Sequence, residues 1–313
     1  MAFTLDTLRA SLPGAGPVAK AVRFDAIDHA YLRLLSQFCV MAQLPFPEAA
    51  LDGDEFAIDG IDFRFRVDGK RAPGMLNVWC DVGPVPPNGE QSCYRLLLES
   101  DLYYQGRFSA TMALCPETGW VVNCARAPID GLTATELYRF VKQLAAHALA
   151  WQRRAPDAVN AAPALAPRAE RGADMPAKPW QDDAIVLLLN YCHGEGLGMH
   201  AVEAVLAGAP LLIDGASFII DHSATTPDNV CSVYCDYGRL AAPADGVDLY
   251  RTMLMVNMLM FPALGHSMMI SAHSNHLLLR HDFLIKHMKQ PRLKQLIDSL
   301  ARNFSEWKKK NPH

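Results

Sequence analysis

The hydrophobic positions in the first half of the chain alternate between helical and strand spacing. Three segments carry apolar residues every three or four positions and are predicted to be helices: 27–43, 91–104 and 133–154. Five segments are predicted to be strands, from alternation in 63–67 and from short apolar stretches bounded by turns elsewhere: 56–58, 63–67, 76–82, 108–115 and 120–125. The resulting order, α-β-β-β-α-β-β-α, predicts an α+β fold with an antiparallel sheet.

The second half of the chain shows the same order of patterns. Its predicted helices are residues 182–192, 247–261 and 292–309. Its predicted strands are residues 201–206, 210–213, 217–222, 230–237, 267–272 and 276–282. The strand at 201–206 has no counterpart in the first half.

The two halves also share sequence. The stretch Val-Trp-Cys-Asp-Val-Gly at 78–83 returns as Val-Tyr-Cys-Asp-Tyr-Gly at 233–238, and Ile-Asp-Gly at 58–60 returns at 213–215. Six core-type positions of the last helix keep one register, with Leu137 and Trp151 matching Leu293 and Trp307 at its two ends. A fixed internal offset of this length indicates a tandem duplication of a domain.

These boundaries divide the chain of 313 residues into four parts. Residues 1–25 are expected to form a loose lead-in, and residues 26–154 and 180–313 the two domains. Residues 155–179 are rich in Ala and Pro without an amphipathic face, so they are expected to form a flexible linker.

Composition and charge exclude several classes of partner and environment. The net charge of −4 leaves no basic face for DNA or RNA. There is no signal-peptide pattern, and the longest apolar run, 253–264, contains Asn257 and Pro262, so no membrane insertion is expected. The eight cysteines are interpreted as reduced thiols, which indicates the cytosol as the compartment.

Few residues suggest catalysis. No nucleophile elbow, phosphate-binding loop or dinucleotide motif occurs. Cys192 and His193 are adjacent, but neighbours on a helix do not face each other, and Cys80 and Cys235 are better explained as buried apolar residues. We therefore expect no catalytic residue, no cofactor and no tightly bound metal.

Two clusters in the second half leave alternatives open. Five histidines crowd one predicted hairpin and its exit, where a metal site competes with the simpler interpretation of solvated turn residues: His266, His273, His276, His281 and His287. Six methionines of a helix and the next strand form either an adaptable binding surface or part of the core: Met253, Met255, Met258, Met260, Met268 and Met269.

The first half resembles the CesT (Tir chaperone) family of type III secretion chaperones. The resemblance rests on the element order, the break Gly-Pro-Val-Pro at 83–86, the helix end Leu-Glu-Ser-Asp-Leu at 98–102, the turn Pro-Glu-Thr-Gly at 116–119 and the last helix, from Leu144 to Trp151. Residues 181–310 resemble the family more faintly, because Gly-Arg-Leu at 238–240 and Ala-His-Ser-Asn at 272–275 replace the break and the turn.

The resemblance implies a non-enzymatic chaperone that holds the extended N-terminal segment of a secreted effector. It also implies a dimer formed largely through the second helix, which this chain carries twice. We therefore expect a monomeric pseudo-dimer whose domains meet through these residues: Tyr94, Leu97, Leu98, Asp101, Tyr250, Met253, Leu254 and Asn257. Asn257 stands where the first copy has Asp101, which would relieve repulsion between two acids.

Four aromatic residues of the first domain are candidates for the effector groove: Phe46, Phe56, Phe63 and Phe65. Strand alternation places Phe63 and Phe65 on one face, so some of the four must be core.

Two alternatives to the effector chaperone remain. The chain could be a regulator or adaptor in which the second domain binds a component of the secretion system. A thiol- or metal-dependent enzyme is the other alternative, supported only by Cys192-His193 and the histidine cluster.

Overall fold

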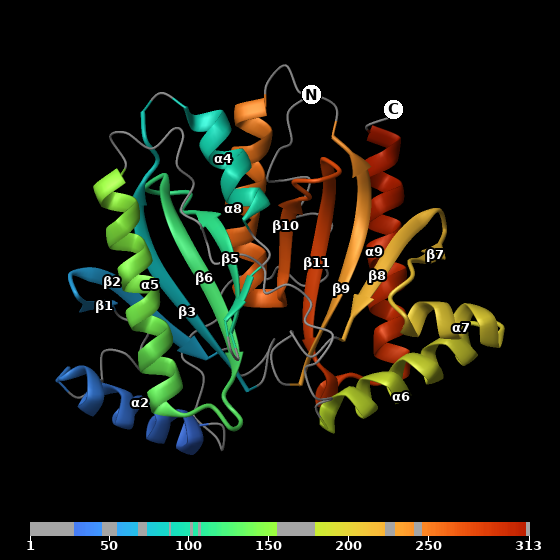
Figure 1. The fold of residues 1–313 in the computed structure, drawn as a ribbon, viewed down its shortest axis with the longest axis horizontal. Coiled ribbons are helices and arrows are strands. Elements are labelled where there is room, and N and C mark those ends of the chain that lie inside the picture. Colours follow the sequence, from blue (N-terminus) through green and yellow to red (C-terminus); the bar gives the residue numbers. More distant parts are fainter. Residues whose placement is uncertain are drawn as a thin grey trace.

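The computed structural model describes two sheets, each flanked by helices (Figure 1). The described residues are 28–45, 55–67, 74–87, 89–100, 103–105, 108–154, 179–222, 229–240 and 246–310. The predicted lead-in, most of the predicted linker and Phe46 lie outside these ranges. The predicted α+β class with two antiparallel sheets is confirmed.

The first domain contains a six-stranded antiparallel sheet in the order β1-β2-β3-β6-β5-β4. Its strands are β1 (Glu55–Ile58), β2 (Ile61–Val67), β3 (Met75–Pro84), β4 (Tyr103–Gln105), β5 (Phe108–Leu114) and β6 (Trp120–Pro128). Its helices are α2 (Asp28–Ala42), α4 (Glu90–Glu99) and α5 (Ala134–Arg154).

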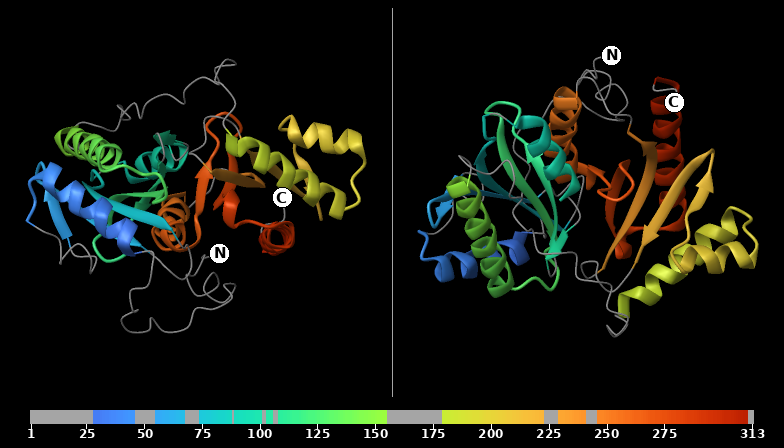
Figure 2. Two further views of the ribbon diagram at one scale, coloured as in Figure 1. Left: turned by 90° about the horizontal axis from the view of Figure 1, so that it is seen from below. Right: turned by 45° about the horizontal axis from the view of Figure 1, so that its top comes forward.

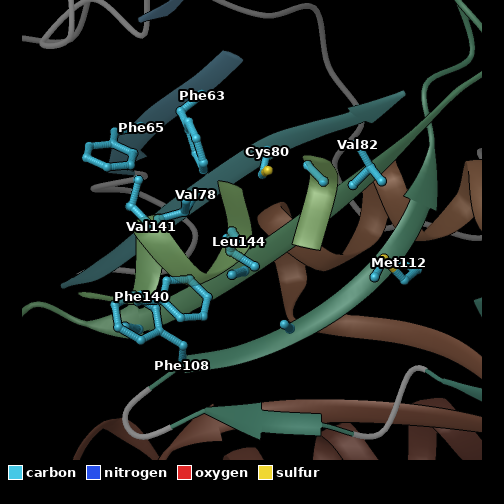
Figure 3. Close-up of a cluster of buried hydrophobic side chains, with 14 of the residues drawn as sticks. Phe63, Phe65, Val78, Cys80, Val82, Phe108, Met112, Phe140, Val141 and Leu144 are labelled. Carbon is cyan, nitrogen blue, oxygen red and sulfur yellow. The ribbon is translucent and has the colours of Figure 1, made fainter. Parts of the chain in front are cut away.

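Strand alternation and helix capping explain the local structure of this domain. In β2, Ile61, Phe63 and Phe65 are buried while the side chains between them face outward. Figure 3 shows Phe63 and Phe65 in one apolar cluster with β3, β5 and α5. At the start of α5, the Glu136 backbone N–H donates to Thr133 Oγ1 (3.2 Å) and the Thr133 N–H donates to Glu136 Oε2 (2.9 Å), which is the expected capping box.

The second domain contains a five-stranded antiparallel sheet in the order β10-β11-β9-β8-β7. Its strands are β7 (Leu211–Ile213), β8 (Ala216–Asp221), β9 (Val230–Arg239), β10 (His266–Ile270) and β11 (His276–Leu284). Its helical segments are α6 (Pro179–Gly194), α7 (Met199–Leu206), α8 (Gly246–Leu264), η2 (Ile285–His287) and α9 (Gln290–Lys310).

The same tight turn joins the first two strands of both sheets. Asp59 and Gly60 have φ angles of 55° and 80°, and Asp214 and Gly215 have φ angles of 51° and 78°. Two successive residues with positive φ match the right-handed twist of a hairpin, and Asp-Gly is a preferred pair for it. The repeated Ile-Asp-Gly stretch therefore forms one turn twice.

Two predicted elements were wrong. The predicted helix 91–104 ends at Glu99, where Ser100 Oγ donates to the Leu97 carbonyl (2.8 Å), and β4 follows it. The predicted strand 201–206 is helix α7, whose buried residues Val202 and Val205 lie three positions apart on one helical face. Its β-branched valines suggested a strand, but packing of that face determines the structure.

The two domains pack on each other through α4 and α8, the helices predicted at 91–104 and 247–261. Helix α4 lies against α8 between the two sheets (Figures 1 and 2). Helix α8 also crosses to the first domain, where Phe261 joins a buried cluster with Ala113, Val122 and Cys124 of β5 and β6. The arrangement is that of a pseudo-dimer in one chain.

Candidate functional site

The seam between the domains is lined by apolar side chains of α4 and α8. Six of the residues expected at this interface are buried and share one cluster: Tyr94, Leu97, Leu98, Tyr250, Met253 and Leu254. Asp101 lies outside the described residues. The role of these residues in holding the domains together stays a prediction.

Asn257, in the middle of α8, makes the central polar contact of the seam. Its Nδ2 donates to the carbonyl of Met112 in the first domain (3.1 Å) and to the carbonyl of Met268 in the second (2.9 Å). Its Oδ1 accepts from the Met268 backbone N–H (2.6 Å). Met112 and Met268 occupy corresponding positions of β5 and β10, so one fully buried amide joins the equivalent strands of both domains.

A second polar group lies beside Phe261 at the seam. The guanidinium groups of Arg126 and Arg280 lie 5.7 and 5.4 Å from its ring centre. Arg280 also donates from Nη2 to the Ala110 carbonyl of the first domain (3.2 Å). Buried charges need such partners, because removing them from water is costly.

Asp282 balances part of this positive charge. Its Oδ1 accepts from Ser232 Oγ (2.7 Å) and lies 3.4 Å from Arg280 Nε. At the surface, Lys286 of the second domain pairs with Asp130 of the first (2.7 Å). Polar contacts between the domains therefore extend from the buried centre to the rim.

The histidine cluster separates into different environments. His266 and His281 pair across β10 and β11 with ring centres 4.4 Å apart, at the positions where the first domain has Ala110 and Ala125. His276 Nδ1 lies 2.8 Å from Asp236 Oδ2, and His273 is exposed in a turn. Among the described residues, no three His, Cys, Asp or Glu side chains gather in a way that could hold a metal.

Burial, followed by the charge of Arg126, lowers the pKa of His266 to about 4. Burial, His266, Arg126 and Arg292 lower the pKa of His281 well below its ordinary value. The folded protein therefore holds both imidazoles neutral at neutral pH.

This pair predicts a loss of stability in mild acid. In the unfolded chain both histidines titrate near pH ~6.5. Because their folded pKa values are lower, their contribution is fully present above that pH and is lost as the pH falls toward about 4. We expect the free energy of unfolding, measured with urea, to fall by about 4 kcal/mol between pH 7 and pH 5, which is about 2 kcal/mol for each histidine.

The double variant His266→Ala/His281→Ala introduces the residues that the first domain has at these positions. Its free energy of unfolding should depend less on pH than that of the wild type. The variant His273→Ala should keep it, because that side chain is exposed. An unchanged slope in the double variant would contradict the assignment to this pair.

The four aromatic candidates for an effector groove have different positions. Phe63 and Phe65 are 1 % and 0 % exposed, so their assignment to a partner surface is corrected: β2 turns them into the core. Phe56 is half-buried, and its ring centre lies 4.7 Å from that of Phe65 and 5.9 Å from that of Phe38. Phe46 lies outside the described residues.

Other apolar side chains face solvent. In the first domain, Val40 of α2 is 80 % exposed, and Met41 and Trp120 are also exposed. Among the described residues of the second domain, the large apolar side chains that are exposed are Val186, Met199, Leu212, Ile219 and Leu259. Sequence patterning did not identify Val40, although its position opposite the buried face of α2 was readable from the helical period.

The six methionines of the cluster on α8 and β10 face inward. Met253, Met268 and Met269 are buried, and the other three are half-buried. This favours the core interpretation over an open methionine-rich surface.

The cysteines singled out in the sequence are buried. Burial raises the pKa of the Cys80 and Cys192 thiols, and it raises the pKa of Cys235 to about 12. A thiol that stays protonated is a weak nucleophile.

None of the helices in the described segments combines the length and apolar character required to span a bilayer.

Comparison with known proteins identifies a family for part of the chain. Residues 33–152, within the first domain, match the Tir chaperone protein (CesT) family. A comparison with curated proteins gives no match.

Similar solved structures include two complexes. The crystal structure of the ExsC–ExsE complex is 22 % identical, covers 43 % of this chain and 99 % of its own, and has a TM-score of 0.33. The Yersinia pestis type III secretion chaperone SycH, in complex with a fragment of YscM2, is 17 % identical, covers 39 % of this chain and 98 % of its own, and has a TM-score of 0.31. At these values, neither likeness adds an argument about function.

Proposed function

We propose that this chain is a cytoplasmic type III secretion chaperone that binds an extended segment of a secreted effector and keeps it competent for export. The observation that carries the proposal is the match of residues 33–152 to a family of secretion chaperones. The packing of α4 on α8 supports it, because the resemblance implies a dimer through the second helix and this chain supplies both copies.

Binding of an extended segment requires no catalytic group. A strand edge offers backbone hydrogen bonds, and neighbouring apolar side chains offer pockets. In the first domain β1 forms one end of the sheet, and Phe56 of β1 packs on Phe38 of α2. Helix α2 also exposes Val40 and Met41. We therefore propose that the effector segment lies along β1 and the outer face of α2.

The proposed function is tested first by capture from the bacterial host. The tagged full-length chain should retain a secretion substrate, identified by mass spectrometry, and deletion of that substrate's N-terminal segment should abolish capture. Retention of the truncated substrate would contradict the proposal.

A charge on α2 should then weaken effector binding. We expect Val40→Asp to raise the Kd for the captured effector about tenfold, because the highly exposed valine would be replaced by a hydrated carboxylate inside an apolar contact. Urea unfolding should be nearly unchanged, since surface substitutions usually alter stability by less than ~0.5 kcal/mol. Calorimetric titration provides the Kd.

Val186→Asp is the matched control, because it makes the same change at an exposed helical valine of the second domain. Weaker binding in Val186→Asp together with unchanged binding in Val40→Asp would move the effector surface to the second domain.

The second candidate function is a regulator or adaptor whose second domain binds another partner. The exposed Met199 of helix α7 and the exposed Leu212 of β7 favour it, because they offer apolar side chains of the second domain to a partner. Capture of a component of the secretion system that persists in Val40→Asp and is lost in Met199→Asp would support this alternative.

A further inference from the structure

A cavity of about 320 Å³ lies where the two domains meet at the end of β11. Its wall comes from both domains, with Met75 of β3 and Arg126 of β6 on one side and η2, α9 and the ends of β9 and β11 on the other. This is the size at which pockets for small organic ligands begin. The cavity is distinct from the β1–α2 surface described above.

One part of the cavity lining is apolar. Met75, Val230, Phe283 and Leu284 are buried, and Leu264, Met288 and Leu296 extend the apolar wall. Three of these residues, Met75, Val230 and Leu284, form one buried cluster across the seam. An apolar chain would therefore be enclosed by both domains.

The charged groups around the cavity are mostly cationic. Arg126 is buried in its wall, and Arg292 of the first turn of α9 stands exposed at its rim. The two arginines lie close enough for both to disfavour protonation of His281, which also lines the cavity. His287, also at the rim, is exposed.

The cavity contains one acid, Asp282, and its Oδ1 is already engaged by Ser232 Oγ and Arg280 Nε. Arg126 and Arg292 are the positively charged side chains of the lining, and the carboxylate of Asp282 is already paired with Arg280. A positive rim over an apolar floor attracts anions with an apolar body.

We propose that this cavity binds a small amphiphilic carboxylate, with its apolar chain against the buried floor and its carboxylate at Arg126 and Arg292. Arginine suits this role because its planar group can bind a carboxylate through two parallel hydrogen bonds. Since the wall comes from both domains, the ligand stabilises their packed arrangement. This inference stands independently of effector binding.

The test uses the full-length chain and decanoate as the probe. Calorimetric titration should give a Kd on the order of 100 µM, and decanol, which has the same chain without the charge, should bind at least about tenfold more weakly. Decanoate should also raise the Tm, because it binds only the folded arrangement.

Two variants locate the site. Arg292→Gln should raise the Kd for decanoate about tenfold, and Ser299→Trp, which fills the cavity from α9, should abolish binding. Arg302→Gln is the matched control, because it removes the same charge from the exposed surface of the same helix and should leave the Kd unchanged.

A peptide ending in a leucine carboxylate distinguishes the source of the ligand. If the peptide displaces decanoate and the same peptide with an amidated C-terminus does not, the natural ligand is assigned to the C-terminus of a protein. Absence of decanoate binding, or binding that is unchanged in both Arg292→Gln and Ser299→Trp, would overturn the proposal.

Discussion

The double variant Leu98→Asp/Leu254→Asp is expected to separate the two domains. Both leucines are fully buried, one on α4 and one on α8, within the cluster that spans the seam. Each substitution removes apolar packing worth about 2–5 kcal/mol, and a buried carboxylate adds a desolvation cost. The sum is comparable with the whole stability of a typical domain, ~5–15 kcal/mol. The packed arrangement should therefore be lost.

Small-angle X-ray scattering should show a larger radius of gyration for this variant. Light scattering should report a single chain of 34.5 kDa for the wild type, as expected for a pseudo-dimer within one polypeptide. Circular dichroism distinguishes separation from unfolding, because separated domains keep their helices. If the aspartates unfold both domains, the same measurements are made on the milder variant Leu98→Ala/Leu254→Ala.

Leu259→Asp is the matched control for the double variant. It places the same charge on α8 at a side chain that is 45 % exposed, so the scattering profile and the unfolding transition should match those of the wild type. A compact double variant with wild-type urea unfolding would show that α4 and α8 do not hold the domains together.

The internal repeat and the strand alternation predicted most of the fold. The period-2 pattern of Ile61, Phe63 and Phe65 determined which face of β2 is buried, and the repeated Asp-Gly pairs marked both first hairpins. These features depend only on residues that are neighbours in the sequence, so a single sequence is enough to predict them. The functional interpretation of Phe63 and Phe65 was wrong for the same reason, because alternation made them core residues.

Two local elements were predicted wrongly because their residue patterns fit more than one type of secondary structure. Val202 and Val205 fit a strand by their β-branched side chains and a helix by their spacing. The short strand β4 was absorbed into the preceding helix prediction, because apolar residues continue at helical spacing beyond Glu99.

The polar contacts at the seam between the domains could not be predicted from the sequence. Arg280 is buried in β11 and donates to a carbonyl of the other domain, so its partner is distant in sequence. The available signal was the difference between the two copies. His266 and His281 replace an alanine pair, and Asp282 replaces an arginine, Arg126. Such replacements indicate positions where the copies have diverged to fit each other.

Asn257 gives the second large expected effect. The variant Asn257→Leu removes the donor to the Met112 and Met268 carbonyls and the acceptor for the Met268 N–H. These backbone groups would remain buried without their side-chain partner, and each unsatisfied group costs about 1–3 kcal/mol. We expect a loss of about 3 kcal/mol in the free energy of unfolding, measured with urea.

Thr252→Ala is the control for this substitution. Its hydroxyl donates to the Asp248 carbonyl one turn earlier on the exposed side of α8 (2.7 Å), so its removal should cost less than ~0.5 kcal/mol. Equal losses in Thr252→Ala and Asn257→Leu would show that the amide has no special role at the seam.

Asn257→Asp tests why the two copies differ at this position. The aspartate found in the first copy would keep the acceptor for the Met268 N–H but replace the amide donor with an oxygen that faces two carbonyls. Burial raises the pKa of such a carboxyl above its unfolded value of ~3.9, so the penalty relative to the wild type should grow as the pH rises through the folded pKa. Unfolding of this variant and of the wild type at pH 5 and pH 8 measures that difference. A penalty independent of pH would show that the amide is selected for its shape. A penalty that grows with pH would show that asparagine replaces aspartate in the second copy because only the amide supplies a hydrogen-bond donor.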